Sequence, residues 1–354
     1  MTSRAGDEIY VRDQGEADET ERREETAGFG QGAGGRTGGD APGFRCGGGD
    51  AAGTDTAQQQ AKPKLAGSRV NDTDCTAFLQ WALPRLGLCW LGFRKVRRQV
   101  CKRLKRRLGV LQLASLAAYR ERLEADPAEW SVLDECCHIT ISRFFRDRRV
   151  FETLRSHVLP ELAQRAEREG RAVHIWSAGC ASGEEPYTIK ILWDLDVARS
   201  HPGISLSVLA TDVDLTMLAR AQKTCFQATS LRELPPPLVE QAFDQAGARY
   251  CVRTQYRRGI DFLHEDLRSR APAGCFDMIL CRYVAFTYFA PSLQREVLAR
   301  IVERLLPKGY LVIGTHERLP GEALRLAPLR AAPQILQKGA NDRTGCSGPD
   351  SAGA

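Results

Sequence analysis

The stretch Ala172–Leu192, which reads AVHIWSAGCASGEEPYTIKIL, decides the fold that we expect for this chain. A short apolar run with β-branched and aromatic residues meets a cluster of small residues, and a helical pattern then opens with Glu184, Glu185 and Pro186. This order predicts a strand, a tight turn and a helix N-terminus. Small residues in the turn let a ligand approach the backbone, and the N–H groups at the helix start then face that ligand.

The two acids in the first helical turn restrict the kind of ligand. They would repel a phosphate, so a cation or a hydroxyl-rich ligand fits better. The stretch also contains neither G-x-G-x-x-G nor a Walker lysine, which are the signatures of phosphate-binding loops. Taken alone, the same pattern is also typical of a glycine turn whose acids complement the helix dipole.

The segment WSAGCASGEEPY (residues 176–187) resembles the S-adenosylmethionine loop of the CheR family of chemotaxis receptor methyltransferases, which reads much like SAxCxTGEEPY. Further matches follow in order over roughly Phe78 to Pro320. The resemblance implies an α/β fold: a Rossmann-like class I methyltransferase sheet with a small N-terminal all-helical domain and a small antiparallel β insertion. It implies S-adenosyl-L-methionine as the cofactor and protein-glutamate O-methyltransferase activity.

The 354 residues are enough for two domains with a sizeable core. Residues 1–70 are rich in small and charged residues and poor in aromatics, so we expect a disordered tail there. The remaining pattern divides into a helical domain at 71–138, a linker and helix at 139–171, and a methyltransferase domain at 172–330. A second disordered tail is expected at 331–354.

Twelve cysteines are scattered along the chain without a C-x-x-C motif, and no apolar signal segment leads it. We therefore expect buried thiols in a reducing cytoplasm rather than a disulfide framework. The apolar run Ala77–Phe93 is interrupted by Gln80, Pro84 and Arg85, and it is too short and too polar to span a bilayer. No metal site is expected, and the protein is expected to be a monomer.

A basic helix is expected around residues 94–107, with Val96, Val100, Leu104 and Leu108 recurring every fourth residue on its buried face. The other faces carry nine cations: Arg94, Lys95, Arg97, Arg98, Lys102, Arg103, Lys105, Arg106 and Arg107. Nucleic acid, an acidic phospholipid surface and an acid-rich protein helix all fit this charge, as does a merely solvated face. The resemblance favours the protein helix, since the family's basic helix is thought to face glutamate-bearing receptor helices, and it disfavours nucleic acid.

The segment HITISRFFRD (residues 138–147) matches a family linker that reads close to I-N-x-T-x-F-F-R. In the family the asparagine, threonine and arginine of this linker reach the cofactor and the active site. The matching positions here are Thr140, Ser142 and Arg146, so the resemblance implies a role in cofactor binding for all three and in catalysis for Arg146. We interpret the two phenylalanines as core residues.

Gly179 and Glu185 are the cofactor-binding candidates in the glycine loop, with Glu185 facing the ammonium group or the ribose on the family pattern. Asp212 follows the expected strand Ser205–Leu209, about thirty residues beyond the glycine loop. A Rossmann-like sheet places there the acid that binds ribose hydroxyls. Asp214 is better explained as the N-cap of the next helix.

Two short runs, 249–253 and 259–263, flank a basic turn and predict an antiparallel insertion at 249–264, which corresponds to the family's β-subdomain. Asp266 and Leu267 follow at the position where the family contacts the adenine. Asp266 would accept a hydrogen bond from the exocyclic amine, and Leu267 would cover the ring.

The run Phe276–Cys281, which is apolar except for Asp277, predicts a buried central strand, and open α/β sheets bind ligands beyond the carboxyl ends of such strands. The family reads C-R-N-V-x-I-Y-F here. Tyr283 stands in place of the asparagine that lies against the cofactor, Val284 matches the valine, and Tyr288 matches the active-site tyrosine. Tyr283 could stack on the cofactor, hydrogen-bond to it or crowd the pocket. His316 is one place away from the histidine of the family's G-H-S-E, so it has no assigned role.

Methyl transfer is an in-line displacement at a sulfonium, and a carboxylate acceptor with a pKa of roughly 4.3 is already ionised and needs no general base. Alignment and a dry pocket supply the rate, with Arg146 holding the carboxylate and the Tyr288 hydroxyl orienting it. The leading hypothesis is O-methylation of glutamate side chains on an acidic, chemoreceptor-like protein. One alternative is methylation of a small molecule or another protein. The other is a non-catalytic adaptor in which Tyr283 blocks the cofactor.

Overall fold

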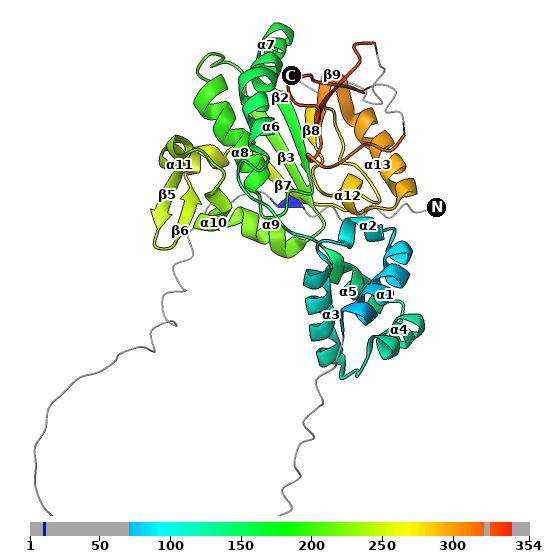
Figure 1. Cartoon of the computed structure of the whole chain (residues 1–354). Coiled ribbons are helices and arrows are strands. Elements are labelled where there is room, and N and C mark those ends of the chain that lie inside the picture. The colour runs from blue at the N-terminus through cyan, green and yellow to red at the C-terminus, as the bar shows by residue number, and fades with distance from the viewer. Residues whose placement is uncertain (1–9, 12–70, 322–325, 342–354) are drawn as a thin grey trace, which may run out of the picture. The chain divides into compact units, whose positions relative to one another are not determined.

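A mixed sheet carries the candidate site. The structure, a computed structural model, describes residues 10–11, 71–321 and 326–341. The strands of the sheet are β1 (Tyr10–Val11), β2 (Val173–Ala178), β3 (Leu206–Asp212), β7 (Ile260–His264), β8 (Phe276–Leu280), β9 (Leu305–Val312), β10 (Leu326–Pro328) and β11 (Ile335–Lys338). Their order is β1-β7-β3-β2-β8-β9-β11-β10 (Figure 1). β7, β3, β2, β8 and β9 run parallel, as predicted for a Rossmann-like α/β fold, and the other three add antiparallel edges.

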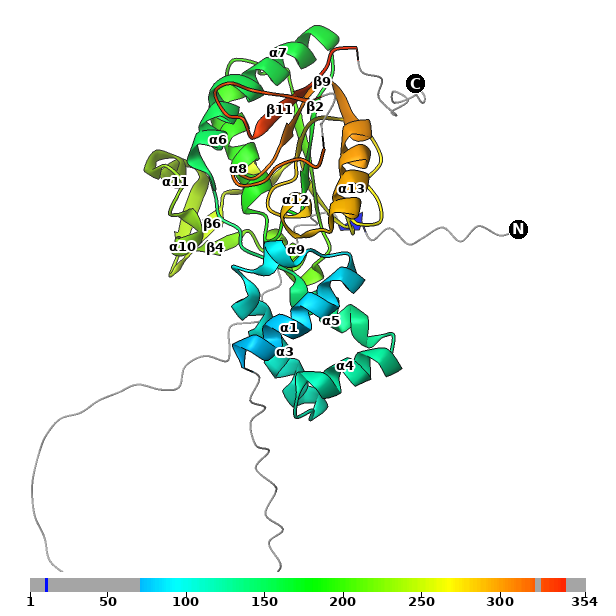
Figure 2. The same ribbon diagram turned by 45° about the vertical axis from the view of Figure 1, so that its right-hand side comes forward.

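Both faces of the sheet are covered, which explains why all five residues of β8 are buried, as its apolar run predicts. One core contains Met278 and Leu280 of this strand, and the other contains Ile279. Figure 2 shows α7 and α8 on one side of the sheet and α13 on the other. The covering helices are α6 (Arg148–Thr153), η2 (Leu154–Val158), α7 (Leu159–Glu169), α8 (Glu184–Leu192), η3 (Trp193–Val197), α9 (Leu215–Gln222), α12 (Ala285–Tyr288) and α13 (Pro291–Arg304).

The region 71–138, expected to form a helical domain, is helical in the structure. It consists of α1 (Asp72–Ala82), η1 (Leu83–Leu86), α2 (Trp90–Phe93), α3 (Arg97–Leu111), α4 (Leu116–Ala125) and α5 (Glu129–Cys137). In the basic helix α3, Val100, Leu104 and Leu108 are fully buried, because residues four apart share one helix face. The domain also contacts the site: the N–H of Cys89 donates to the carbonyl of Tyr288 at 2.7 Å.

The expectation of an antiparallel insertion at 249–264 is wrong in its bounds. β6 (Arg249–Val252) pairs with β4 (Cys225–Gln227) and β5 (Phe243–Ala246) in a separate three-stranded sheet. β7 instead lies parallel to β3 in the central sheet, because its apolar residues Ile260, Phe262 and Leu263 are buried there. Three short helices complete this region: α10 (Ala228–Leu231), α11 (Pro236–Ala242) and η4 (Thr254–Arg257).

The expected tail at 331–354 is also wrong in part. β11 lies within it and pairs with both β9 and β10, because Ile335 and Leu336 bury their side chains. Of the tail expected at 1–70, the structure describes only the two residues of β1, which pair with β7. Residues 1–9, 12–70 and 342–354 of these two segments lie outside the described residues.

Several of the cysteines expected to be buried thiols form disulfides instead. Cys75 on α1 bonds to Cys101 on α3, and Cys225 bonds to Cys251. The second pair consists of directly opposed residues of β4 and β6, a proximity that only the tertiary fold creates. Cys89, Cys136, Cys137, Cys180 and Cys281 are free thiols. No helix that the structure describes combines the length and the apolar character needed to cross a bilayer.

Candidate active site

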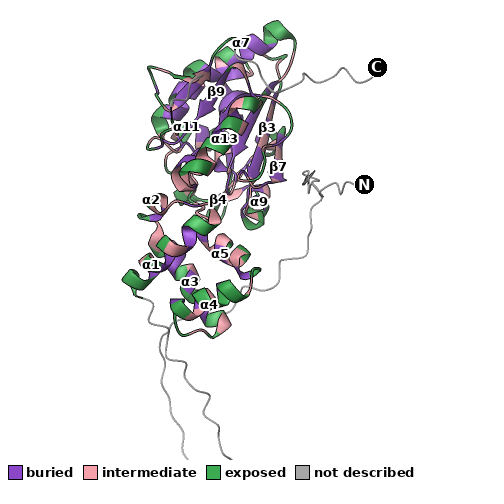
Figure 3. Ribbon diagram, turned by 90° about the vertical axis from the view of Figure 1, so that its right-hand side faces the viewer, coloured by how far each residue is buried: buried purple, intermediate pink, exposed green. Residues whose placement is uncertain are grey.

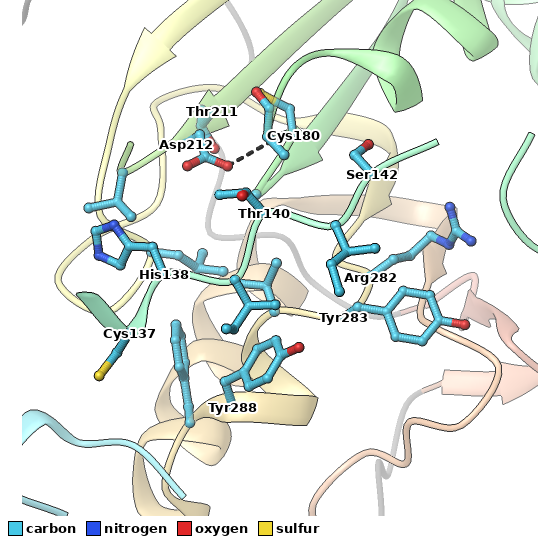
Figure 4. A pocket seen from close by; sticks show the side chains of 18 of the residues that line it. Cys137, His138, Thr140, Ser142, Cys180, Thr211, Asp212, Arg282, Tyr283 and Tyr288 are labelled. Atoms are coloured by element: carbon cyan, nitrogen blue, oxygen red, sulfur yellow. Dashed lines mark hydrogen bonds between the residues drawn. The ribbon is translucent and has the colours of Figure 1, made fainter. Parts of the chain in front are cut away.

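A pocket opens at the carboxyl ends of β2, β3 and β8, and it has about 1080 Å³ of empty space, part of it open to solvent. All the candidate residues predicted from the sequence line it: Thr140, Ser142, Arg146, Gly179, Glu185, Asp212, Asp266, Leu267, Tyr283, Val284 and Tyr288. Figure 4 shows side chains from four separate segments converging on this space.

Gly179 allows the glycine loop to pass close to Val284. Its φ is +77°, in the left-handed region, and a Cβ at this position would lie 2.4 Å from Cγ2 of Val284. Any larger residue would push the loop away from the segment between β8 and α12 that carries Val284. The loop therefore presents backbone to the pocket, as the cluster of small residues predicts.

Asp212 lies at the end of β3 and fastens the glycine loop. Its carboxylate accepts from the N–H of Ala181 at 2.8 Å and from the N–H of Asp214 at 2.9 Å. Burial raises the pKa of Asp212, and these hydrogen bonds oppose that shift. Asp214 caps α9 as predicted, since it accepts from the N–H groups of Thr216 and Met217.

Glu185 is held from two sides. It accepts from the Ser177 hydroxyl at 2.7 Å and from Arg282 at 2.9 Å. The Arg282 guanidinium also donates to Asp147 and to the carbonyl of Arg146, both at 2.7 Å. The Arg282 side chain is only 3% exposed. Burial alone would lower the pKa of Arg282, but Glu185 and Asp147 raise it above its ordinary value.

Tyr283 leaves the cofactor space open. Its hydroxyl donates to Asp147 at 2.6 Å and lies 2.7 Å from the hydroxyl of Thr315. The ring thus extends away from Asp212 and Thr140 (Figure 4). The backbone of Tyr283 has a φ of +58°, a conformation that asparagine adopts more readily than tyrosine does.

Four arginines line the pocket, and Arg146 differs from the other three. The others form ion pairs: Arg143 with Glu233, Arg268 with Asp134 and Asp266, and Arg282 with Asp147 and Glu185. Arg146 donates to the carbonyl of Ile141 at 2.7 Å and has no carboxylate within 4 Å among the described residues. An unpaired guanidinium in a pocket is suited to an anionic ligand.

Tyr288 lines the pocket from α12. Burial raises the pKa of Tyr288, so the phenol stays protonated at neutral pH and can donate a hydrogen bond. Its ring packs against Phe93 of α2, with 5.0 Å between ring centroids.

The segment at the expected adenine side is joined to the helical domain. The Asp266 carboxylate accepts from the Arg268 side chain at 3.0 Å, and Arg268 donates twice to Asp134 of α5, at 2.7 and 2.6 Å. Leu267 is 8% exposed. Asp266 is therefore already paired on one side, while Leu267 lines the pocket with an apolar surface.

Ser142 joins the linker to the glycine loop. Its hydroxyl donates a hydrogen bond to Glu184. Burial raises the pKa of Glu184 above its ordinary value, and the hydrogen bonds from Ser142, Ser182 and Ser230 oppose part of that rise. Thr140 lines the pocket two residues earlier. Phe144 and Phe145 are fully buried, which confirms their assignment to the core.

The family description "CheR methyltransferase, SAM binding domain" matches residues 140–333, more than half of the chain. The chain belongs to the CheR methyltransferase family. It is therefore an S-adenosylmethionine-dependent protein methyltransferase. The pocket fits this cofactor, because Gly179 provides a close backbone approach and Glu185 and Asp212 provide the acids that ammonium and hydroxyl groups require.

Relatives of this CheR-family chain carry chemotaxis names. A probable chemotaxis protein methyltransferase of Rhizobium etli is 36% identical over 232 residues, which cover 63% of this chain and 85% of that protein. Chemotaxis protein methyltransferase 1 of Pseudomonas aeruginosa is 33% identical over 201 residues, 55% of this chain and 72% of that protein. An uncharacterized 104.1 kDa protein of Rhodobacter capsulatus is 33% identical over 220 residues, and this chain spans only 23% of it.

Three residues of the CheR-family site were missed from the sequence. Arg282 and Asp147 form the buried ion pair behind the pocket, and Glu317 accepts from the N–H of Tyr283 at 2.9 Å. A signal was present for Arg282, since a charged residue next to the end of a buried strand requires a partner. Asp147 and Glu317 had no such local signal, because their partners lie far away in the sequence.

Proposed function

We propose that this CheR-family methyltransferase O-methylates glutamate side chains on an acidic, chemoreceptor-like protein helix. The observation that carries the proposal is Arg146, the pocket arginine that lacks a carboxylate partner among the described residues, while the other three are paired. The acceptor carboxylate would complete its ion pair. The chemotaxis names of the relatives support the same class of acceptor.

The cofactor supplies an electrophilic methyl group on its sulfonium. We assign Glu185 to its ammonium group or ribose and Asp212 to the ribose hydroxyls, while Leu267 and Val284 would cover its apolar parts. Gly179 would let the glycine loop approach it. Asp266 and Thr140 would contact it from the rim of the pocket, and Ser142 would act by fixing the linker against Glu184.

No general base is needed for a carboxylate acceptor, which is ionised at neutral pH with a pKa of roughly 4.3. Arg146 would hold the carboxylate by charge-assisted hydrogen bonds. The neutral Tyr288 hydroxyl would donate to the same group and orient the attacking oxygen. The rate then comes from alignment in a pocket that excludes water.

The surface of α3 supports an acidic partner. Six of its region's nine cations are exposed: Arg94, Lys95, Arg98, Lys102, Lys105 and Arg106 (Figure 3). We propose that this exposed basic surface attracts an acid-rich helix. We further propose that the protein is cytoplasmic and monomeric. The free thiols among the described residues fit a reducing cytoplasm, whereas disulfides such as Cys75–Cys101 and Cys225–Cys251 are rare in that compartment.

The test is a tritium-transfer assay with methyl-labelled S-adenosylmethionine on a cell lysate. We expect label on protein that alkali releases as methanol, and we expect Arg146→Ala to lower this transfer about 100-fold or more. Calorimetry should show cofactor binding by this variant close to that of the original protein. Arg148→Ala is the matched control, since Arg148 is exposed and pairs with Glu152 on the surface.

Alkali-stable label would contradict the carboxylate acceptor and favour another methyl acceptor. Unchanged transfer by Arg146→Ala would contradict the role of this arginine. Absence of cofactor binding at millimolar concentration would leave only an adaptor that binds acidic partners.

A further inference from the structure

We propose that Tyr283 is a positioning residue that holds the Arg146 guanidinium in place for the acceptor carboxylate. The inference rests on the proposed function, because positioning matters only if Arg146 binds the acceptor. Where the CheR pattern has an asparagine, this chain has an aromatic ring. The guanidinium carbon of Arg146 lies 3.7 Å from the centre of that ring, well within the range of a cation–π contact.

The ring of Tyr283 is itself fixed. Its hydroxyl donates to Asp147 at 2.6 Å and accepts from the N–H of Thr315 at 3.1 Å. Gly314 gives it room, since a Cβ there would lie 2.6 Å from the ring. A ring anchored in this way offers Arg146 a rigid platform rather than a mobile neighbour.

The backbone of Tyr283 is also held against its preference. Its φ of +58° is unfavourable for a bulky residue. The N–H of Tyr283 donates to Glu317 at 2.9 Å, and Glu317 also accepts from the N–H of Gly314 and the hydroxyl of Thr287, both at 2.6 Å. An asparagine would enter this conformation at lower cost, so the gain from tyrosine lies in its side-chain contacts.

Arg146 needs such a platform. Its guanidinium has five N–H donors, and among the described residues one hydrogen bond is made, to the carbonyl of Ile141. Stacking orders the flat face of the group and leaves the donors at its edge for a carboxylate. Without the ring, the long side chain would regain rotamer freedom that acceptor binding must then remove.

The first test detects the stack without any acceptor. In NMR spectra of the arginine side chains, the Nε–Hε signal of Arg146, assigned with Arg146→Lys, should be shifted upfield by the ring of Tyr283. Tyr283→Phe should keep this shift, and Tyr283→Leu should remove it. An unshifted Arg146 signal in the original protein would overturn the proposal.

The second test is a double-mutant cycle on initial rates of base-labile tritium transfer to a fixed lysate. We expect Tyr283→Leu to lower the rate about tenfold and Tyr283→Phe to lower it less than about threefold. In the Arg146→Ala background, Tyr283→Leu should have no further effect, because Tyr283 acts through Arg146. Calorimetry with S-adenosylmethionine checks that each variant is folded and binds cofactor.

The outcomes separate this inference from the proposed function. If Arg146→Ala loses transfer while Tyr283→Leu does not, or if their effects simply multiply, Tyr283 does not position Arg146 although the function stands. If Arg146→Ala transfers normally, the proposed function has failed, and the NMR signal still decides whether the stack exists.

Discussion

The charged residues around Arg282 at the pocket are at least partly buried and paired, whereas most of the charged residues on α3 are exposed. Arg282 is 3% exposed and contacts two carboxylates and a carbonyl. On α3, Lys102 and Lys105 are exposed. Arg282 and its partners hold the linker, the glycine loop and the end of β8 together. The exposed lysines of α3 form no ion pair with the described residues that would stabilise the fold. The charges around Arg282 therefore fix the positions of neighbouring segments, whereas the charges on α3 are available to attract an acidic partner.

The basic helix itself shows both uses. Of the nine cations at 94–107, three are bound to other parts of the protein: Arg97 pairs with Asp72, Arg107 pairs with Glu129, and Arg103 donates to the carbonyls of Cys136 and His138. These three fasten α3 to its neighbours. Only the remaining six are exposed, so the count of cations in the sequence overstates the surface that a partner meets.

Removing Arg282 should have the largest effect. Arg282→Ala leaves the partly buried carboxylates of Glu185 and Asp147 without their shared partner. Breaking a fully buried ion pair costs about 3–5 kcal/mol, and we expect a loss at the lower end of this range. Urea unfolding should show this loss, together with weaker cofactor binding because Glu185 is no longer held. Arg98→Ala, which removes an exposed arginine of α3, should change stability by less than about 0.5 kcal/mol. Equal stability of the two variants would remove the contrast.

The ion pair of Asp134 with Arg268 should make the next largest contribution to the free energy of unfolding. Hydrogen bonds from His138 and Arg268 outweigh the effect of burial and lower the pKa of Asp134 to about 2. A depressed pKa adds stability above the unfolded value of about 3.9, and this stability is lost as the pH falls through about 2. We expect Asp134→Asn to cost about 2 kcal/mol at pH 7.

The pH dependence distinguishes this ion pair from a surface one. The difference between Asp134→Asn and the original protein, measured by urea unfolding, should be constant above about pH 5 and shrink between about pH 4 and pH 2. Asp126→Asn is the control, since Asp126 forms an i,i+4 pair with Arg122 on the surface. Such a pair contributes about 0.3–0.5 kcal/mol. A difference that does not change with pH would show that Asp134 stabilises by packing alone.

Local patterns in the sequence were sufficient for the elements around the pocket. The strand, turn and helix at 172–192 and the N-cap at Asp214 depend on neighbours a few residues away, and both were predicted. The same holds for the buried stripe of α3. These features follow from periodicity and from capping chemistry, which need no knowledge of distant residues.

The features that were not predicted from the sequence depend on residues far apart in the chain. Arg282 and Asp147 are 135 residues apart, and no local pattern reveals that they meet. The run at 259–263 has the composition of a strand, but whether it pairs with 249–253 or with β3 is decided by the burial of both its faces. The side chain of Tyr283 could have filled the pocket, and its direction is set by Thr315 and Asp147, which lie on other segments.

Gly179 should give a smaller effect, of steric rather than electrostatic origin. Gly179→Ala forces a Cβ onto Val284 and places alanine at a φ of +77°, a left-handed conformation that costs about 1–2 kcal/mol. Calorimetry should show weaker binding of S-adenosylmethionine, because the loop must move. In Gly109→Ala the new Cβ meets nothing within 4 Å, and a helix interior favours alanine over glycine by about 0.5–1 kcal/mol. Weaker binding in both variants would exclude a local clash.

The exposed cations of α3 should give the smallest change in stability and the clearest dependence on salt. Lys102→Ala and Lys105→Ala should each alter the free energy of unfolding by less than about 0.5 kcal/mol. Combined, they should slow methyl transfer to an acidic acceptor several-fold at low salt. This difference should fade at 1 M salt, where the screening length is about 3 Å.

Lys223→Ala is the matched control for the α3 lysines, because Lys223 is an exposed lysine at the end of α9. It should leave transfer unchanged at every salt concentration. If it slows transfer as much as the α3 variants do, the effect comes from net charge rather than from the basic surface. If neither slows transfer, the acceptor does not approach along α3, and the pocket arginine Arg146 must select the acceptor without long-range attraction.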